Sequence, residues 1–352
     1  MKKVLFIWGL ALTVLIQLSS CSDNESIAAE DFKCVFDALD WGKRTTYVIG
    51  HKSPDTDAVC SAITYAYLMR ALGYRCEARV AGKLNNETKM VLNRFGIEIP
   101  KVLDDAEGER IIMTDHSELQ HAISGMDKAK ILQIIDHHAL GSAVTAAPLY
   151  CRIMPIGSSC SVVYTSFKDY GVTIGKDMAG LMMSALLSDT NNMTSTTVAA
   201  VDSLMYAELV PLVGMTDVDS YYQEMTDSLA SYTGMTDEEI FFSDYKDYAS
   251  ASVGKDIGVA VVNSLDEAAQ VSLRDRMTSF MPTALASRQR EMVFTMVLNK
   301  TANYTDILYQ GEGAKEAAEA AFGPSDSDYI RCEGQLSRKN DFIPALSKVL
   351  QP

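Results

Sequence analysis

The stretch that decides the fold is IGHKSPDTD, residues 49–57, which follows the β-branched and aromatic run TTYV, residues 45–48. We predict a strand that ends there and a loop that presents three side chains of metal-ligand type, His51, Asp55 and Asp57. Imidazole mixed with hard carboxylates suits Mn²⁺, Co²⁺ or Zn²⁺ better than Ca²⁺. The stretch therefore predicts a transition-metal site at the end of a strand.

The same stretch also has a purely structural interpretation. Pro54 stiffens the turn, and Asp57 is placed to cap a helix that we predict from Ala58 to Leu72. In that interpretation Asp57 is only a helix cap and His51 only a histidine at the end of a strand. The two interpretations are about equally good for this motif alone, so the remaining ligand-type residues decide between them.

Strands and helices alternate along the next hundred residues. We predict strands at 77–80, 110–114 and 130–135 and a helix at 87–95. Apolar strands separated by helices indicate an α/β domain with a parallel sheet that has helices on both faces. Functional residues of such sheets gather beyond the carboxyl ends of the strands.

The predicted strands end at residues of ligand type. Asp115 follows one strand, and Asp136, His137 and His138 follow another. A predicted helix at 157–170 is followed by a second at 176–187. Asp189 comes just after the second helix, at the unfavourable pole of the helix dipole, and a nearby cation would explain it.

A second domain follows an acidic helical stretch at 198–232. The sequence TGMTD, residues 233–237, breaks the helical pattern, so we expect a first domain at 45–233 and a second at 237–352. The second is expected to contain strands near 248–253, 257–262, 292–298 and 306–309 and helices at 266–280 and 342–350. It contains no histidine, and its notable residues are the cations Lys246, Arg338 and Lys339.

The N-terminus has the pattern of a secretory signal with a lipoprotein processing site. A basic pair, Lys2-Lys3, precedes an apolar run at 4–16 and the sequence LSSC, residues 18–21. We expect a signal peptide at 1–20, lipidation of Cys21 and a tether and extension at 21–44. The protein is then anchored by lipid to a membrane of the cell envelope, outside the cytoplasm. The alternative is an uncleaved anchor, but the apolar run is shorter than the roughly 20 residues that a spanning helix needs.

Charge and cysteine content exclude some classes of function. Removal of Lys2 and Lys3 changes the formal charge from −15 to −17, which repels long nucleic acids. Six cysteines remain after Cys21, and their spacing contains no Cys-x-x-Cys pair. This argues against a zinc ribbon, although one or two disulfides stay open.

The ligand-type residues are sufficient for two neighbouring metal ions. They are His51, Asp55, Asp57, Asp115, His137 and Asp189. Two metals about 3.5–4 Å apart stabilise the attacking and leaving oxygens of a phosphoryl displacement and activate a bridging water. Lys246, Arg338 and Lys339 would bind the phosphate oxygens. Each residue alone has a structural interpretation, such as a turn former or part of a solvated surface pair. Together these interpretations are improbable, because every one of the residues would have to fall at the end of a strand or helix by chance.

These motifs resemble those of the manganese-dependent family II inorganic pyrophosphatases, which belong to the DHH phosphoesterases. The similarity covers Thr45 to the C-terminus. It rests on five motifs: HxxPDTD at 51–57, DH at 115–116, DHH at 136–138, SDT at 188–190 and SRK with a later proline at 337–344. The resemblance implies an N-terminal DHH domain, a C-terminal DHHA2 domain and an active site in the cleft between them.

The resemblance also implies a role for each matched residue. His51 and Asp55 would ligate one metal, Asp57 and His137 the other, and Asp115 and Asp189 would bridge. His138 would contact the substrate, Asp136 would position the histidine pair, and Lys246, Arg338 and Lys339 would hold the phosphates. The expected cofactors are two Mn²⁺ or Co²⁺ ions, with additional Mg²⁺ accompanying the substrate. The expected partners are diphosphate or a short polyphosphate, and a second copy bound through the DHH domain.

One departure from the family affects the substrate. The family continues SDT with apolar residues, a lysine and a Ser-Pro pair, whereas NNMTST, residues 191–196, follows here. Hydrolysis of inorganic diphosphate to two orthophosphates is the first hypothesis. An exopolyphosphatase, an oligonucleotidase and a non-catalytic surface lipoprotein remain as alternatives.

Overall fold

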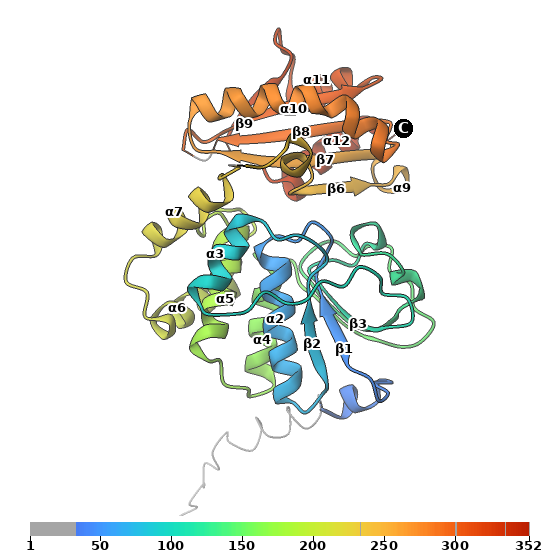
Figure 1. The fold of residues 1–352 in the computed structure, drawn as a ribbon, viewed down its shortest axis with the longest axis vertical. Coiled ribbons are helices and arrows are strands. Elements are labelled where there is room, and N and C mark those ends of the chain that lie inside the picture. The colour runs from blue at the N-terminus through green and yellow to red at the C-terminus, as the bar shows by residue number, and fades with distance from the viewer. Residues whose placement is uncertain (1–32, 233, 300, 335, 352) are drawn as a thin grey trace, which may run out of the picture.

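The structure is a computed structural model that describes residues 33–232, 234–299, 301–334 and 336–351. Two α/β domains follow one another along the chain, each built on a five-stranded sheet. In Figure 1 the first domain, coloured blue to yellow, lies below the second, coloured orange to red. The predicted signal peptide and Cys21 lie outside the described residues.

The first sheet is entirely parallel. Its strands, in the spatial order β2-β1-β3-β4-β5, are Cys76–Arg79, Thr46–Ile49, Arg110–Thr114, Lys130–Asp136 and Tyr150–Ile153. The central strands are nearly continuous apolar runs, as expected for a sheet that is covered on both faces. The α/β class with a parallel first sheet is therefore confirmed. The short edge strand β5 was not predicted.

Alternate residues of these strands face two different apolar clusters. Val48, Ile112 and Ile135 face the larger cluster, which also contains the buried residues of α2, α4 and α5. Ile49 and Met113 face the opposite cluster, which is completed by the segments around the 3₁₀ turns η1 (Leu119–His121) and η2 (Met126–Lys128). Long helices therefore cover one face, and short turns and loops cover much of the other.

The helices of the first domain begin close to the expected positions. They are α2 (Thr56–Ala71), α3 (Asn86–Arg94), α4 (Ser159–Asp169), α5 (Lys176–Asp189), α6 (Ala200–Val213) and α7 (Val218–Leu229). The prediction that Asp57 caps the first long helix is wrong. Asp55 is the cap, since its Oδ1 accepts a hydrogen bond from the Ala58 amide at 3.0 Å, and Asp57 lies inside the first turn.

The second sheet is mixed. Its strands, in the spatial order β10-β9-β8-β7-β6, are Ile330–Glu333, Tyr304–Gly311, Met292–Asn299, Ile257–Ser264 and Tyr245–Tyr248. Strands β7 and β8 are parallel, and the other three pairs are antiparallel. The predicted strand at 248–253 is wrong, because β6 ends at Tyr248 and Ser250–Val253 forms the helical turn α9.

Helices cover this second sheet. They are α8 (Asp237–Phe241), α10 (Glu267–Arg288), α11 (Ala314–Phe322) and α12 (Ile343–Leu350), with the π-helical turn η3 (Arg338–Phe342) before α12. Helix α10 continues through Pro282 and is longer than predicted, and α11 and β10 were not predicted. The turn η3 carries the SRK motif toward the first domain.

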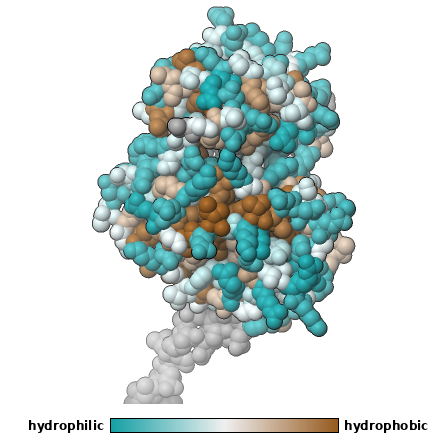
Figure 2. Space-filling model, in the orientation of Figure 1, coloured by the Kyte–Doolittle hydropathy of each residue, from teal (hydrophilic) through white to brown (hydrophobic). Residues whose placement is uncertain are grey.

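Cysteines and surface complete the picture of the described residues. The six cysteines at 34, 60, 76, 151, 160 and 332 are all free. No helix in the described part of the chain combines the length and apolar character that a membrane crossing needs. Figure 2 shows one face of the molecule, on which hydrophilic side chains surround a group of hydrophobic ones in the middle of the first domain.

Candidate metal centre and substrate cleft

The six predicted ligand residues come together at one edge of the first sheet. His51 and Asp115 follow β1 and β3, and His137 follows β4. Asp55 and Asp57 lie at the start of α2, and Asp189 is the last residue of α5. Because the strands are parallel, their carboxyl ends meet at this edge, and the two helix ends supply the remaining carboxylates.

The first ligand group consists of His51, Asp55 and Asp115, whose ligand atoms lie within 4.8 Å of one another. His51 Nε2 is 3.3 Å from Asp55 Oδ2 and 3.2 Å from Asp115 Oδ2. His51 is fully buried, and so is most of Asp115. One imidazole nitrogen and two carboxylates can thus face a single ion.

The second group consists of Asp57, His137 and Asp189. His137 Nε2 is 3.4 Å from Asp189 Oδ2 and 3.9 Å from Asp57 Oδ2. It is also 3.4 Å from Asp115 Oδ1. Asp115 therefore directs one oxygen at each group, which is the arrangement of a bridging ligand, whereas the structure places Asp189 with the second group.

The Nε2 atoms of the two ligand histidines, His51 and His137, point toward the carboxylates of the site. The Nδ1 atom of His51 is 2.9 Å from the Lys52 carbonyl oxygen, and that of His137 is 3.0 Å from the Ile156 carbonyl oxygen. A carbonyl only accepts hydrogen bonds, so Nδ1 carries a proton and Nε2 is the nitrogen that can ligate an ion. Neither Nε2 atom has a hydrogen-bond partner among the described residues, although both face carboxylate oxygens. Imidazole nitrogens and carboxylates that face one another fit a cation.

The pKa values of two of the four carboxylates, Asp57 and Asp189, show the same excess of negative charge. Burial, followed by repulsion from Asp115 and Asp55, raises the pKa of Asp57 well above its usual value. Burial and repulsion from Asp57 do the same to the pKa of Asp189. In the absence of metal, these groups relieve their repulsion by binding protons. Divalent ions would replace those protons and restore the carboxylates to their charged form.

Two local structures fix the positions of the carboxylates. The amides of Ser159 and Cys160, at the N-terminus of α4, donate hydrogen bonds to the Asp57 oxygens at 2.6 and 2.9 Å. Asp115 adopts a left-handed backbone conformation with φ of 61°, and its Oδ1 accepts a hydrogen bond from the Ser159 hydroxyl at 2.9 Å. Strained backbone at a non-glycine residue is typical of functional sites. Ser159 was not singled out from the sequence, because its contact with Asp57 joins residues 102 positions apart.

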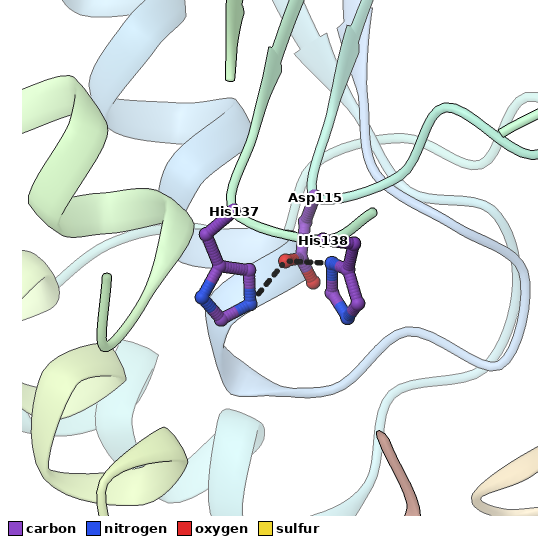
Figure 3. A group of neighbouring side chains, drawn as sticks. All are labelled: Asp115, His137 and His138. Atoms are coloured by element: carbon purple, nitrogen blue, oxygen red, sulfur yellow. Dashed lines mark ion pairs between the residues drawn. The ribbon is translucent and has the colours of Figure 1, made fainter. Parts of the chain in front are cut away.

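Asp136 organises the histidine pair. Its Oδ1 accepts hydrogen bonds from the His137 and His138 amides at 2.8 and 3.0 Å, and it is 2.9 Å from His138 Nδ1. Figure 3 shows the Asp115 carboxylate between the two imidazole rings. His138 Nδ1 is 3.6 Å from Asp115 Oδ1, so His138 borders the ligand groups. The predicted positioning role of Asp136 matches these contacts.

The three cations of the second domain face the ligand groups across a cavity of about 840 Å³, which Asp115, His138, Lys246, Arg338 and Lys339 all line. Lys246 is only 9% exposed, and its ammonium forms no ion pair with any described residue. The Lys339 ammonium reaches the first domain and donates a hydrogen bond to the His137 carbonyl at 3.4 Å. Positive charge is thus held opposite the metal-type ligands.

Arg338 is held rigidly by its own domain. Its guanidinium donates to the Asp244 carbonyl at 2.9 Å, to the Val259 carbonyl at 3.2 Å and to the Asp244 carboxylate at 2.5 Å. The side chain is 10% exposed, which excludes a solvated surface residue. Asp244 was not singled out from the sequence, although it lies two residues before Lys246. Its contact joins segments 94 residues apart, which a local pattern does not reveal.

The segment that departs from the family motif lies beside the same cavity. Asn191, Asn192 and Met193 have successive positive φ values of 52°, 53° and 63°. Asn191 and the hydroxyl residues Thr194 to Thr197 line the cavity opposite Ser337 and Asn340. The departure therefore changes the polar wall of the cleft and leaves the ligand groups intact.

Fold and site together define a two-domain protein of the DHH class. Residues 45–186 match the family described as DHH family, N-terminal domain, and residues 223–349 match the DHHA2 domain. A manganese-dependent inorganic pyrophosphatase of Methanothrix thermoacetophila is 37% identical over 308 residues, covering 87% of this chain and 98% of that protein. The chain belongs to the family of manganese-dependent inorganic pyrophosphatases.

Structural comparison gives the same family. A crystal structure from Methanococcus jannaschii, described as a candidate family II inorganic pyrophosphatase, superimposes with a TM-score of 0.79 at 29% identity. The match covers 87% of this chain and 99% of that one. Both domains therefore have counterparts in a single solved chain.

Proposed function

We propose that this protein hydrolyses inorganic diphosphate to two orthophosphates in the cleft between its domains, with two Mn²⁺ ions as cofactors. The observation that carries the proposal is the position of Asp115. Its two oxygens face two separate ligand groups, 3.2 Å from His51 Nε2 and 3.4 Å from His137 Nε2. This paired site faces cations from the second domain, of which Lys246 and Lys339 form no ion pair with any described residue, and the family relatives are named as manganese-dependent.

The residues of the first domain have distinct tasks in this reaction. His51, Asp55 and Asp115 would hold one ion, and Asp57, His137, Asp115 and Asp189 the other. Bound Mn²⁺ supplies Lewis-acid stabilisation and lowers the pKa of a nucleophilic water. Mixed imidazole and carboxylate donors also suit Co²⁺.

The remaining site residues bind the substrate. Lys246, Arg338 and Lys339 bind its non-reacting oxygens and offset the charge that moves onto the leaving phosphate. His138 borders the ligand groups and orients the same substrate. Diphosphate enters with Mg²⁺, because a tetravalent anion is otherwise strongly repelled by the carboxylates that line the cleft.

The alternatives receive less support. An oligonucleotidase needs a basic track for the strand, and the chain carries a formal charge of −15. A non-catalytic binding protein does not need two complete ligand groups with buried, inward-facing imidazoles. An exopolyphosphatase uses the same two-metal chemistry, and the changed wall at Asn191 to Thr196 is the feature that favours it.

A phosphate-release assay separates these functions. The Mn²⁺-loaded protein is given diphosphate, tripolyphosphate, long-chain polyphosphate and a dinucleotide, each at the same concentration. We expect the highest kcat/KM with diphosphate and loss of activity on removal of Mn²⁺ by a chelator. A higher kcat/KM with long-chain polyphosphate would replace the proposal by the exopolyphosphatase, and activity in excess chelator would exclude both.

We further propose that the protein works as a lipid-anchored enzyme of the cell envelope, with Cys21 as the anchor. The support is the N-terminal sequence, in which a basic pair, an apolar run and LSSC occur in order. We also propose a homodimer through the DHH domain. In its support, β5 is the outer strand of the first sheet and pairs there only with β4 in the described chain, so its other edge is open to a second strand.

A further inference from the structure

A second cavity adjoins the ligand groups on the side of the interdomain connection. Its volume is about 850 Å³, and its lining includes Asp55 and Asp189 of the two ligand groups together with Tyr232 and Gly234 of the connection. It is therefore continuous with the metal centre, but it contains none of Lys246, Arg338 or Lys339. The proposed hydrolysis of diphosphate assigns no role to this second cavity.

Two cations of this cavity have neither an ion pair nor a side-chain hydrogen bond among the described residues, whereas a third, Lys89, donates a hydrogen bond to Asn86 Oδ1 at 3.2 Å. Lys52 directly follows the ligand His51, and Arg288 is the last residue of α10. Neither side chain forms an ion pair within the part of the chain that the structure describes. Lys83 lines the same cavity but is paired with Glu239 at 2.8 Å. The free cations are notable in a chain with an excess of acidic residues.

The surroundings hold these cations without neutralising them. The Arg288 guanidinium lies 4.4 Å from the ring centre of Phe242 and 5.4 Å from that of Tyr245, which fixes it over apolar surface. The nearby Asp247 carboxylate is already engaged, because its Oδ1 is 2.7 Å from the Tyr245 hydroxyl and 2.9 Å from Arg290 Nε. The single negative charge of Asp247 thus lies near three cations, Lys52, Arg288 and Arg290. The net charge of this group is therefore positive.

We propose that Lys52 and Arg288 form a second phosphate subsite beside the metal centre. The subsite rests on the proposed hydrolysis of diphosphate and extends it. A guanidinium offers a planar fork and an ammonium a point charge, and a phosphate dianion satisfies both. The phosphate has two sources with the same chemistry: the terminal group of a chain longer than diphosphate, or the orthophosphate product on its way out.

The test compares two activities in the same variants. Lys52→Gln, Arg288→Gln and the double variant are made in the full chain and loaded with Mn²⁺, and Lys83→Gln is the control from the same cavity. If the subsite holds a chain end, the double variant lowers the ratio of kcat/KM for tripolyphosphate to that for diphosphate about tenfold. Arg288→Lys should lower this ratio less than Arg288→Gln does, and Lys83→Gln should leave it at the wild-type value.

The second arm measures inhibition by orthophosphate during diphosphate hydrolysis. If the subsite holds the leaving product, the inhibition constant rises about tenfold in the double variant while the substrate ratio stays constant. An unchanged ratio together with an unchanged inhibition constant overturns the subsite. Calorimetric titration measures orthophosphate binding directly, without relying on hydrolysis. It therefore distinguishes failure of the subsite from failure of the proposed function. A wild type that does not hydrolyse diphosphate but binds orthophosphate through Lys52 and Arg288 would retain the subsite and lose the function.

Discussion

The role of an individual carboxylate in this site depends on contacts with residues that are distant in the sequence. Asp55 and Asp57 are two residues apart and equally suited to cap a helix, and the cap was predicted at Asp57. The structure gives the cap to Asp55, while the Asp57 oxygens accept hydrogen bonds from amides more than 100 residues away at the start of α4. The presence of ligand residues could be predicted, because each lies at the end of an element. Their local roles depend on contacts that no local pattern contains.

Asp115 is the residue on which both ligand groups depend. Asp115→Asn keeps the shape of the side chain and removes its charge. We expect diphosphate hydrolysis to fall on the order of 10²-fold or more, and Mn²⁺ affinity to fall with it, because one carboxylate faces both groups. Steady-state kinetics and calorimetric titration with Mn²⁺ measure both effects. The exposed Asp127 of η2 provides the control, and Asp127→Asn should behave as wild type. Full activity of Asp115→Asn at saturating Mn²⁺ would refute the shared site.

Asp244 fixes the guanidinium of Arg338 and should act through it. Asp244→Asn keeps the backbone acceptor and removes the carboxylate that receives the guanidinium. We expect kcat/KM for diphosphate to fall about tenfold with unchanged Mn²⁺ titration, because a charge-assisted hydrogen bond is lost. Arg338→Lys should fall at least as far, since an ammonium cannot replace the fork. Equal kinetics for Asp244→Asn and wild type would show that Arg338 needs no such support.

At the scale of elements, long periodic segments could be predicted and short or edge elements could not. The central strands of both sheets and the long helices lie within a few residues of their expected positions. Residues 248–253 were expected as a strand, but β6 ends at Tyr248 and Gly254 adopts a left-handed conformation that ends the helical turn α9. The edge strands β5 and β10 are short and partly exposed, so their sequences lack the apolar run of a central strand.

The close approach of α2 to the end of β1 at Gly50 positions the ligand residues Asp55 and Asp57, which lie at the start of α2. A Cβ atom added at Gly50 would lie 2.6 Å from the Ala58 carbonyl oxygen and 2.7 Å from its Cβ. Gly50→Ala should therefore push α2 away from β1, destabilise the protein by about 1–3 kcal/mol and weaken Mn²⁺ binding, because α2 carries Asp55 and Asp57. Chemical denaturation and Mn²⁺ titration measure the two effects.

Gly175 provides the matched control, since it precedes α5, has an ordinary φ of −78° and meets nothing within 4 Å of an added Cβ. Gly175→Ala should leave both measurements close to wild type. If Gly50→Ala also leaves them unchanged, the contact between β1 and α2 does not position the site.

At the scale of the whole molecule, each domain supplies half of one site. The first domain carries the acidic and imidazole ligands, and the second carries the cations, as the distribution of histidines in the sequence predicted. Contacts that already join the halves include Lys339 to the His137 carbonyl, His121 to the Asp247 carbonyl at 2.9 Å, and Lys83 to Glu239. Only the first could be expected from the sequence motifs, because the residues of the other two contacts belong to no motif.

The proposed lipid anchor depends on one residue of the N-terminal segment, Cys21. Cys21→Ser should release the protein from the membrane fraction, because each acyl methylene that is buried contributes about 0.8 kcal/mol to anchoring. Fractionation of the native host followed by immunodetection measures this. Ser26→Ala is a control, since it lies outside LSSC and keeps the cysteine. A wild-type protein in the soluble fraction would contradict the lipid anchor without affecting the proposed reaction.

The most direct test of the shared site is one variant measured in two ways. Arg338→Ala removes a cation of the second domain and leaves all metal-type ligands in the first domain untouched. Calorimetric titration should still find two Mn²⁺ ions per chain with near wild-type affinity, while kcat/KM for diphosphate falls on the order of 10²-fold. Wild-type kinetics in Arg338→Ala would remove the second domain from the site, and a single bound Mn²⁺ in the wild-type protein would contradict the paired metal centre.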